Sequence, residues 1–146
     1  MPKASQIVAK ETRRRIIRCS FEIVVEQGEG ALSFLSIAKA ANISRSGINA
    51  HFKRKEHLLN ETRPMLAALI LKPLDLSSPN KFLKSWTKVI DEDARYRQLL
   101  SNCKNIMESV GGAKNLINLI QGDKDEVKNV LCYAIGYATI FYPEKK

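Results

Sequence analysis

The sequence of 146 residues predicts an all-α protein. Apolar residues recur at three- and four-residue intervals through most of the chain, as in an amphipathic helix. Short runs of glycine, proline, serine and asparagine separate these segments and mark turns. Hydrophobic residues make up 45% of the chain and charged residues 27%, which is typical of a globular protein with a buried core.

Three helices are predicted in the N-terminal part. The first covers residues 7–27 and ends at Gly28, which suits a left-handed C-cap. Ser33 and Ser44 are N-cap candidates for two short helices. Asn42 lies between these helices and tolerates the left-handed conformation of a tight turn.

The remaining elements are also predicted to be helical. A fourth helix begins near Lys55, and Pro64 inside it predicts a kink or a break. Residues 71–80, with Pro73 and Pro79, are predicted to form a linker. Further helices are predicted over residues 81–91, 94–110, 113–121 and from the acidic cluster at Asp123 to Pro143.

The charge is basic and lies mostly near the N-terminus. The formal net charge is +9. Up to Arg63 there are 12 basic and 6 acidic residues, and after it 12 basic and 9 acidic ones. Such a balance favours a polyanionic partner: nucleic acid, an anionic membrane surface or an acidic protein.

Several classes of protein are excluded by missing features. The three cysteines are odd in number and form no C-x-x-C pair, so neither a disulfide framework nor a zinc site is predicted. No nucleotide-binding, hydrolase or metalloprotease motif occurs, so we expect no enzyme, no metal and no cofactor. No apolar run reaches the ~18 residues of a membrane span, and no secretory signal is present. We therefore expect a cytoplasmic protein without membrane contact.

A helix-turn-helix is predicted from the two short helices. They are joined by a turn over residues 41–44, and the small Ala38 before it allows the helix axes to approach. Ile37, Ile43 and Ile48 supply the apolar contacts between them. The second helix of such a pair enters the major groove of DNA.

The same spacing extends on both sides of the turn. The residues that carry it are Arg13, Ile16, Ile17, Cys19, Ser20, Ile23, Val24, Glu26 and Gly28, then Leu32, Ser33, Ile37, Ala38, Ala41, Asn42, Ile43 and Ser44, then Ile48, Asn49, Ala50, His51, Phe52, Lys53, Lys55, Glu56, Leu58 and Leu59. This pattern resembles the DNA-binding domain of the tetracycline-repressor (TetR) family. The resemblance implies a helix-turn-helix domain over residues 1–60 and a helical dimerisation or effector-binding domain over residues 61–146.

Three positions depart from the family pattern. Asn49 stands where the family usually has an aromatic residue, Ser46-Gly47 where it often has glycine-threonine, and Asn42 in place of the turn glycine. Gly47 lowers helix propensity by up to ~1 kcal/mol relative to alanine. This predicts a recognition helix that orders fully only on DNA.

Ten residues are candidate DNA contacts. Arginine pairs with guanine and asparagine with adenine, so the exposed start of the second short helix is predicted to read bases. Helix N-caps and nearby lysines suit phosphate contacts, and a basic N-terminal arm suits phosphate or the minor groove. The set is Arg45, Ser46 and Asn49 for bases, Ser33, Ser44, His51, Lys53 and Lys55 for phosphates, and Arg13 and Arg14 in the arm. The alternatives are packing beside Phe52 for the histidine and a solvated helix start for the arm.

The C-terminal part carries two further predictions. The last helix is apolar on nearly all sides, so it is predicted to be covered by a second copy of the chain. The dimer residues are Val127, Leu131, Ala134, Ala138 and Phe141, together with the 113–121 segment. A pocket for a small hydrophobic ligand is predicted at Trp86, Cys103, Met107, Tyr133 and Tyr137, the alternative being that these side chains are plain core.

The predicted function is sequence-specific DNA binding that regulates transcription. The expected form is a homodimeric repressor on a pseudo-palindromic operator, released by a small ligand. One alternative is a helix-turn-helix protein without an effector, which acts through a protein partner or its own concentration. Another is a protein-interaction module whose helix-turn-helix has lost DNA binding.

Overall fold

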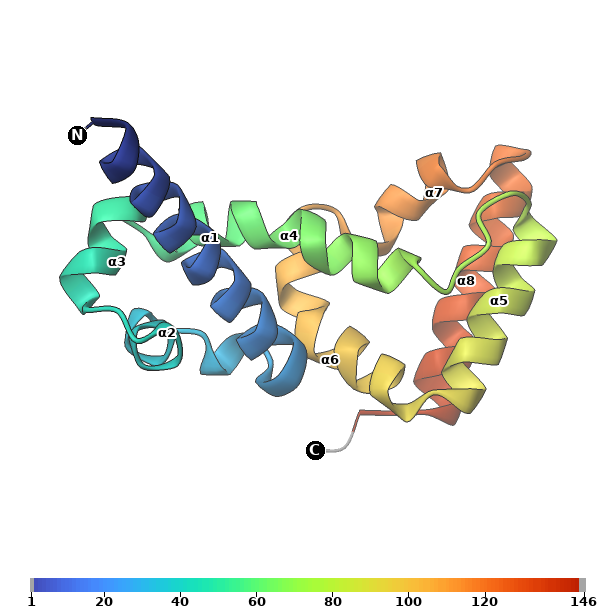
Figure 1. Cartoon of the computed structure of the whole chain (residues 1–146). Coiled ribbons are helices and arrows are strands. Elements are labelled where there is room, and N and C mark those ends of the chain that lie inside the picture. The colour runs from blue at the N-terminus through green and yellow to red at the C-terminus, as the bar shows by residue number, and fades with distance from the viewer. Residues whose placement is uncertain (1, 145–146) are drawn as a thin grey trace. The chain divides into compact units, whose positions relative to one another are not determined.

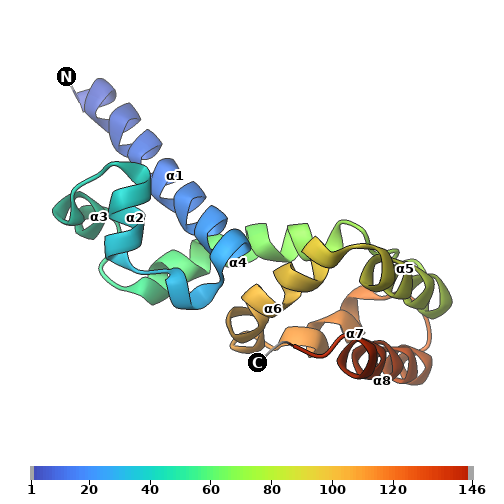
Figure 2. The ribbon, with the colours of Figure 1, turned by 90° about the horizontal axis from the view of Figure 1, so that it is seen from below.

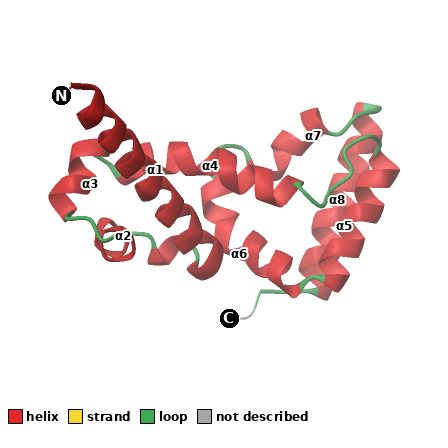
Figure 3. Ribbon diagram, in the orientation of Figure 1, coloured by secondary structure: helices red, strands yellow, loops and turns green. Residues whose placement is uncertain are grey.

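The computed structural model describes residues 2–144, and this part of the chain contains helices and no strand (Figures 1 and 3). This confirms the all-α fold class. The chain divides into two compact units, Met1–Ala67 and Ala68–Lys146. The division falls inside a helix, beyond the boundary at residue 60 drawn from the sequence.

Unit 1 contains α1 (Pro2–Gln27), the 3-10 helix η1 (Glu29–Ala31), α2 (Phe34–Ala41), α3 (Arg45–His51) and most of α4 (Lys55–Leu71). Its core is made of side chains at helical spacing from all four α-helices. The fully buried ones include Ile16, Val24, Ile37, Ile48, Phe52 and Leu58. Residues 3–11 of α1 are exposed. They extend the helix beyond its predicted start at Ile7.

The predicted serine caps and the turn of unit 1 are confirmed. Gly28 follows the end of α1 with φ +89° and ψ 170°, so it needs the freedom of glycine but is not the left-handed cap that was predicted. Ser33 and Ser36 form a capping box at the start of α2, since each side chain accepts the backbone N–H of the other residue. Asn42 has φ +53°, in the left-handed region, and its N–H donates to Ala38 O. Ser44 caps α3 by accepting from the Gly47 N–H at 3.1 Å.

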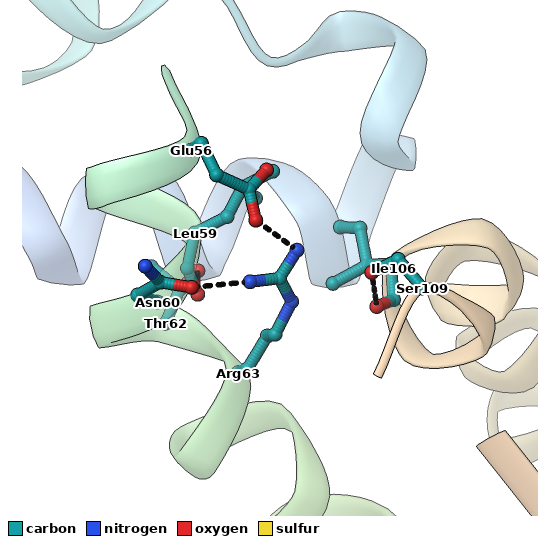
Figure 4. Close-up of polar contacts among 7 residues, drawn as sticks. All are labelled: Glu56, Leu59, Asn60, Thr62, Arg63, Ile106 and Ser109. Atoms are coloured by element: carbon teal, nitrogen blue, oxygen red, sulfur yellow. Dashed lines mark hydrogen bonds and ion pairs between the residues drawn. The ribbon is translucent and has the colours of Figure 1, made fainter. Parts of the chain in front are cut away.

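Of the kink or break predicted at Pro64, the break is wrong, because helix α4 continues through this residue. The residue before it, Arg63, is buried, and its guanidinium forms an ion pair with Glu56 at 2.8 Å and donates to Asn60 Oδ1 at 2.5 Å (Figure 4). Asn60 lies one turn and Glu56 two turns earlier on the same helix. Pro64 itself is exposed.

Unit 2 contains the end of α4 and α5 (Pro79–Glu92), α6 (Ala94–Glu108), η2 (Gly112–Asn115), α7 (Leu116–Leu119) and α8 (Lys124–Phe141). Helices α5 and α8 lie side by side (Figures 1 and 2). The Trp86 indole N–H on α5 donates to Ala134 O on α8 at 2.9 Å, and the Tyr96 hydroxyl on α6 donates to Ile70 O at 2.7 Å. The buried core includes Phe82, Ile90, Leu99, Cys103, Ile106, Val127 and Leu131.

The segment predicted as one helix over residues 113–121 is instead a 3-10 helix followed by a single α-turn, α7. Gly111 and Gly112 before it and Gly122 after it have positive φ, so the chain reverses at both ends. Within residues 2–144, no helix is long and apolar enough to cross a membrane.

Candidate nucleic-acid interface

The helix-turn-helix is built by α2, its turn and α3. Ile37 and Ile48 are fully buried and hold the two helices together. The turn is fixed by Asn42 and by the Ile43 N–H, which donates to Ala38 O at 3.1 Å. The residues of α3 that do not pack inward are therefore presented on a rigid frame.

The three predicted base-reading residues lie exposed on α3. Arg45 and Asn49 are four residues apart, so they share one side of the helix. Ser46 is also exposed, and its hydroxyl lies 3.1 Å from that of Ser44. Exposed polar side chains thus lie along α3 beside the buried Ile48.

Cations follow directly after α3. Lys53, Arg54 and Lys55 are exposed, and Lys55 opens α4. His51 is half-buried at the end of α3, beside the buried Phe52. The lysines are free to reach a phosphate, whereas the histidine is partly covered by its own domain.

Arg13 makes three contacts inside unit 1. Its Nη1 donates to His51 O at 3.3 Å, and its Nη2 pairs with Glu61 Oε1 at 2.9 Å. Its guanidinium carbon lies 4.3 Å from the centre of the Phe52 ring. This one side chain connects α1 with the end of α3 and with α4. The sequence predicts this arginine in a basic arm, and no local spacing links it to Glu61.

The other arginines of α1 point outward. Arg14, Arg15 and Arg18 are exposed and, with Ile17 and Met65, line a surface depression of about 480 Å³. Glu11 is the one acidic residue among its lining. This side of α1 is strongly cationic.

Gly47 allows a close approach inside the helix-turn-helix. A Cβ at this position would lie 2.8 Å from Ile43 Cγ2 and 3.2 Å from Ser44 Oγ. Ile43 belongs to the turn and supports α3. The glycine, which the sequence analysis treated as a weak point of the helix, thus makes room for the turn beneath it.

The five residues predicted to line a ligand pocket lie in different surroundings in unit 2. Cys103 is buried in the core, Tyr133 is 58% exposed, and the Tyr133 and Tyr137 rings stack on each other at 6.2 Å. Trp86 alone among the five lines a groove of about 450 Å³ between α5, α6 and α8, and Met107 is half-buried outside its lining.

The predicted dimer residues are corrected in part. Val127, Leu131 and Ala134 are buried within unit 2 on the helix that packs against α5, so they are closed to a second chain. Ala138 is half-buried, and Phe141 is 64% exposed. The exposed apolar side chains of α8 are Tyr133, Ile135, Ile140 and Phe141.

Two comparisons with known proteins give a match over part of the chain. Residues 16–62 match the family described as bacterial regulatory proteins, tetR family. The chain is similar to the HTH-type transcriptional regulator AcrR of Shigella flexneri, with 36% identity over 61 residues. The aligned segment covers 42% of this chain and 28% of that relative. No solved structure matches the chain.

Proposed function

Because its first unit carries a helix-turn-helix domain of the tetR family of transcriptional regulators, we propose that this protein represses transcription as a homodimer on a pseudo-palindromic operator. The observation that carries the proposal is the exposed polar side of α3, followed by exposed cations and mounted on a buried frame. A regulator that acts on DNA operates in the cytoplasm of a bacterium.

Base edges are contacted by Arg45, Ser46 and Asn49 in this proposal. All three are exposed at the side of α3 that the core leaves open. Arginine pairs bidentately with guanine and asparagine with adenine, each worth about 1–3 kcal/mol of discrimination. Asn49 replaces the aromatic residue usual in the family and favours an adenine at its position.

Phosphates are contacted by Lys53 and Lys55 after α3, by Ser33 and Ser44 at the caps, and by Arg14 on α1. Each is exposed. Arg13 has a different role, because its guanidinium is engaged by His51, Phe52 and Glu61. It positions α3 and does not reach DNA. The side chain of His51 is half-buried and adds a further phosphate contact in this proposal.

The homodimer forms through the exposed apolar side of α8. Tyr133, Ile140 and Phe141 are 58%, 72% and 64% exposed, and Tyr137 links the two flanking rings. Exposed apolar surface of this kind marks interaction sites. In a two-fold dimer the two α3 helices meet half-sites about 34–36 Å apart, or further along the duplex by whole turns.

A small ligand bound in unit 2 would release the operator by favouring a state that binds DNA less well. The groove between α5, α6 and α8 is its site in this proposal.

The test begins with selection of bound duplexes from a random DNA pool, using the full chain. The selected sequence should be a pseudo-palindrome. Affinity for it should fall linearly with the logarithm of salt concentration. Arg45→Ala should cost about 1–3 kcal/mol on the selected site and relax its sequence preference. Lys53→Ala should weaken all duplexes alike and lower the salt slope by about one.

Lys88→Ala, which removes an exposed cation on α5, is the control and should change neither quantity. Failure of the chain to bind any duplex at low salt would contradict the proposal and favour a protein-interaction module. Selection of binding sites without two-fold symmetry would contradict the dimer alone.

A further inference from the structure

We propose that the groove between α5, α6 and α8 binds a small amphipathic anion, a carboxylate that carries an apolar chain or ring. This proposal names the chemical class of the ligand that the proposed function leaves open. It rests on the proposed function only where it concerns the effect of the ligand on DNA binding. Binding itself involves unit 2 alone and is tested without DNA.

The groove has the size and chemistry of a ligand site. Its volume of about 450 Å³ lies within the range of about 300–1,000 Å³ of small-molecule pockets. One wall is the side of α6 with Arg97, Leu100, Ser101 and Lys104; the outer two lie three or four residues from the inner pair, so all four share one side of the helix. Trp86 and Ile90 line the groove from α5. A cation therefore stands at each end of a wall that is otherwise nearly apolar.

The opposite wall is the side of α8 with Ile135, Ala138, Thr139 and Tyr142, at the same helical spacing. It carries no charge. Tyr133, Tyr137, Ile140 and Phe141 lie on the other flank of α8. A ligand in the groove and a second chain on the aromatic flank therefore do not compete for the same surface.

Arg97 is held in place before any ligand arrives. Its Nη1 donates to Ile90 O at 2.5 Å, and its guanidinium carbon lies 4.4 Å from the centre of the Tyr142 ring. Tyr142 is fixed in turn, because its hydroxyl donates to Asp91 at 2.9 Å. A rigid guanidinium loses little freedom when it binds a carboxylate.

Asp91 does not neutralise this arginine by an ion pair. Its carboxylate accepts the hydroxyls of Tyr137, at 2.7 Å, and Tyr142. The hydrogen bond to Asp91 raises the pKa of Tyr137 to about 12. Arg97 thus keeps its charge available at the groove.

Lys104 has a weak partner at the far end. Its Nζ lies 3.8 Å from Glu144 Oε1, and both side chains are more than half exposed. Ion pairs of this kind contribute little to stability, so a ligand carboxylate can replace Glu144. The lining therefore contains two cations, Arg97 and Lys104, and one anion, Glu144, that a ligand can displace. Because the rest of the lining is mostly apolar, the groove favours an anion with an apolar body.

Trp86 makes the site measurable, because it is the only tryptophan of the chain and lines the groove. The full chain is titrated with decanoate and with decan-1-ol, below the concentration at which either aggregates, and tryptophan fluorescence is followed. We expect a saturable change for decanoate at one equivalent per chain. Decanoate should bind at least tenfold more tightly than decan-1-ol, and calorimetry should give the same affinity.

Variants separate charge from shape. Lys104→Gln should weaken decanoate at least fivefold and leave decan-1-ol unchanged, whereas Lys88→Gln on α5, outside the groove, should affect neither. Ser101→Phe should fill the groove from an exposed position and abolish both, with an unchanged circular dichroism spectrum as the check on folding. Equal affinity for acid and alcohol, no saturable binding by either method, or equal effects of the two lysine variants would overturn the proposal.

The consequence for DNA is a separate measurement. If decanoate binds but leaves operator affinity unchanged, the site stands and its role as an effector site is refuted. If the chain binds no DNA at all, the fluorescence titration is unaffected and still decides the proposal.

Discussion

Arg13 stacks on Phe52, with its guanidinium carbon 4.3 Å from the ring centre. The same guanidinium donates to His51 O and pairs with Glu61. These contacts join the middle of α1 to the last residue of α3 and to the second turn of α4. A side chain that reads as a surface cation in the sequence therefore fixes the angle at which α3 is presented.

Replacing Arg13 by alanine should lower stability by about 1–2 kcal/mol, the sum expected for a half-exposed ion pair and a cation–π contact. It should also weaken specific DNA binding while leaving the salt slope unchanged, because no phosphate contact is lost. Urea denaturation and salt-dependent anisotropy measure the two effects. Arg14→Ala, on the same helix but exposed, is the control and should leave stability unchanged. A slope that falls by one in Arg13→Ala would assign this residue to a phosphate instead.

Gly47→Ala should destabilise unit 1 although alanine is the better helix former. The substitution gains up to about 1 kcal/mol of propensity. The added Cβ, however, would lie 2.8 Å from Ile43 Cγ2, and overpacking costs about 1–3 kcal/mol. Thermal unfolding of the two proteins gives the sign.

Gly30→Ala is the matched control for this prediction, because nothing lies within 4 Å of a Cβ there. It should raise stability by about 0.4–1 kcal/mol. If Gly47→Ala stabilises the protein as much as Gly30→Ala does, the turn beneath α3 is loose and the helix is limited by propensity alone.

Ile140→Glu should convert the dimer to monomer at micromolar concentration. The side chain is 72% exposed in the single chain, and a buried unpaired carboxylate is costly at an interface. Sedimentation velocity measures the change. Lys128→Glu places the same acidic group on an exposed position of α8 away from the aromatic flank and should leave the dimer intact. Dimers of equal strength in both variants would move the interface elsewhere.

The thiol of Cys103 should react slowly with disulfide reagents. Burial raises its pKa to about 11, and the thiolate is the reactive form. At pH 8 only about 0.1% of it is ionised, and each unit of rising pH towards 11 increases that fraction about tenfold. Cys132 is exposed and should react first. Cys19 is half-buried, so Cys103 is observed alone in a Cys19→Ser, Cys132→Ser protein. A fast phase in that protein would mean that the core around Cys103 opens readily.

Local chemistry accounts for what could be predicted from the sequence. Ser33, Asn42 and Ser44 act on backbone groups within a few residues, so their caps and turn can be read directly from the chain. Ile37 and Ile48 follow the helical period and lie in the core as predicted. Together these residues place the helix-turn-helix and the exposed side of α3.

Contacts between distant residues account for what could not. No sequence pattern near Arg13 predicts its ion pair with Glu61, which lies 48 residues further along the chain. The period of α8 shows several apolar sides but not the one that α5 covers, so Val127, Leu131 and Ala134 were assigned to a partner instead of the core. For Gly47, propensity describes the helix alone, whereas the steric constraint comes from the turn.

The aromatic residues that absorb and emit in the near ultraviolet are distributed unevenly. The single tryptophan and all four tyrosines follow Ala67, so unit 1 holds only phenylalanine. Intrinsic fluorescence and near-ultraviolet circular dichroism therefore report the melting of unit 2 alone, whereas far-ultraviolet circular dichroism reports both. If the unfolding transitions seen by the two methods coincide, the two units unfold in one cooperative event. If they differ, the units unfold one after the other, and no added label is needed to tell.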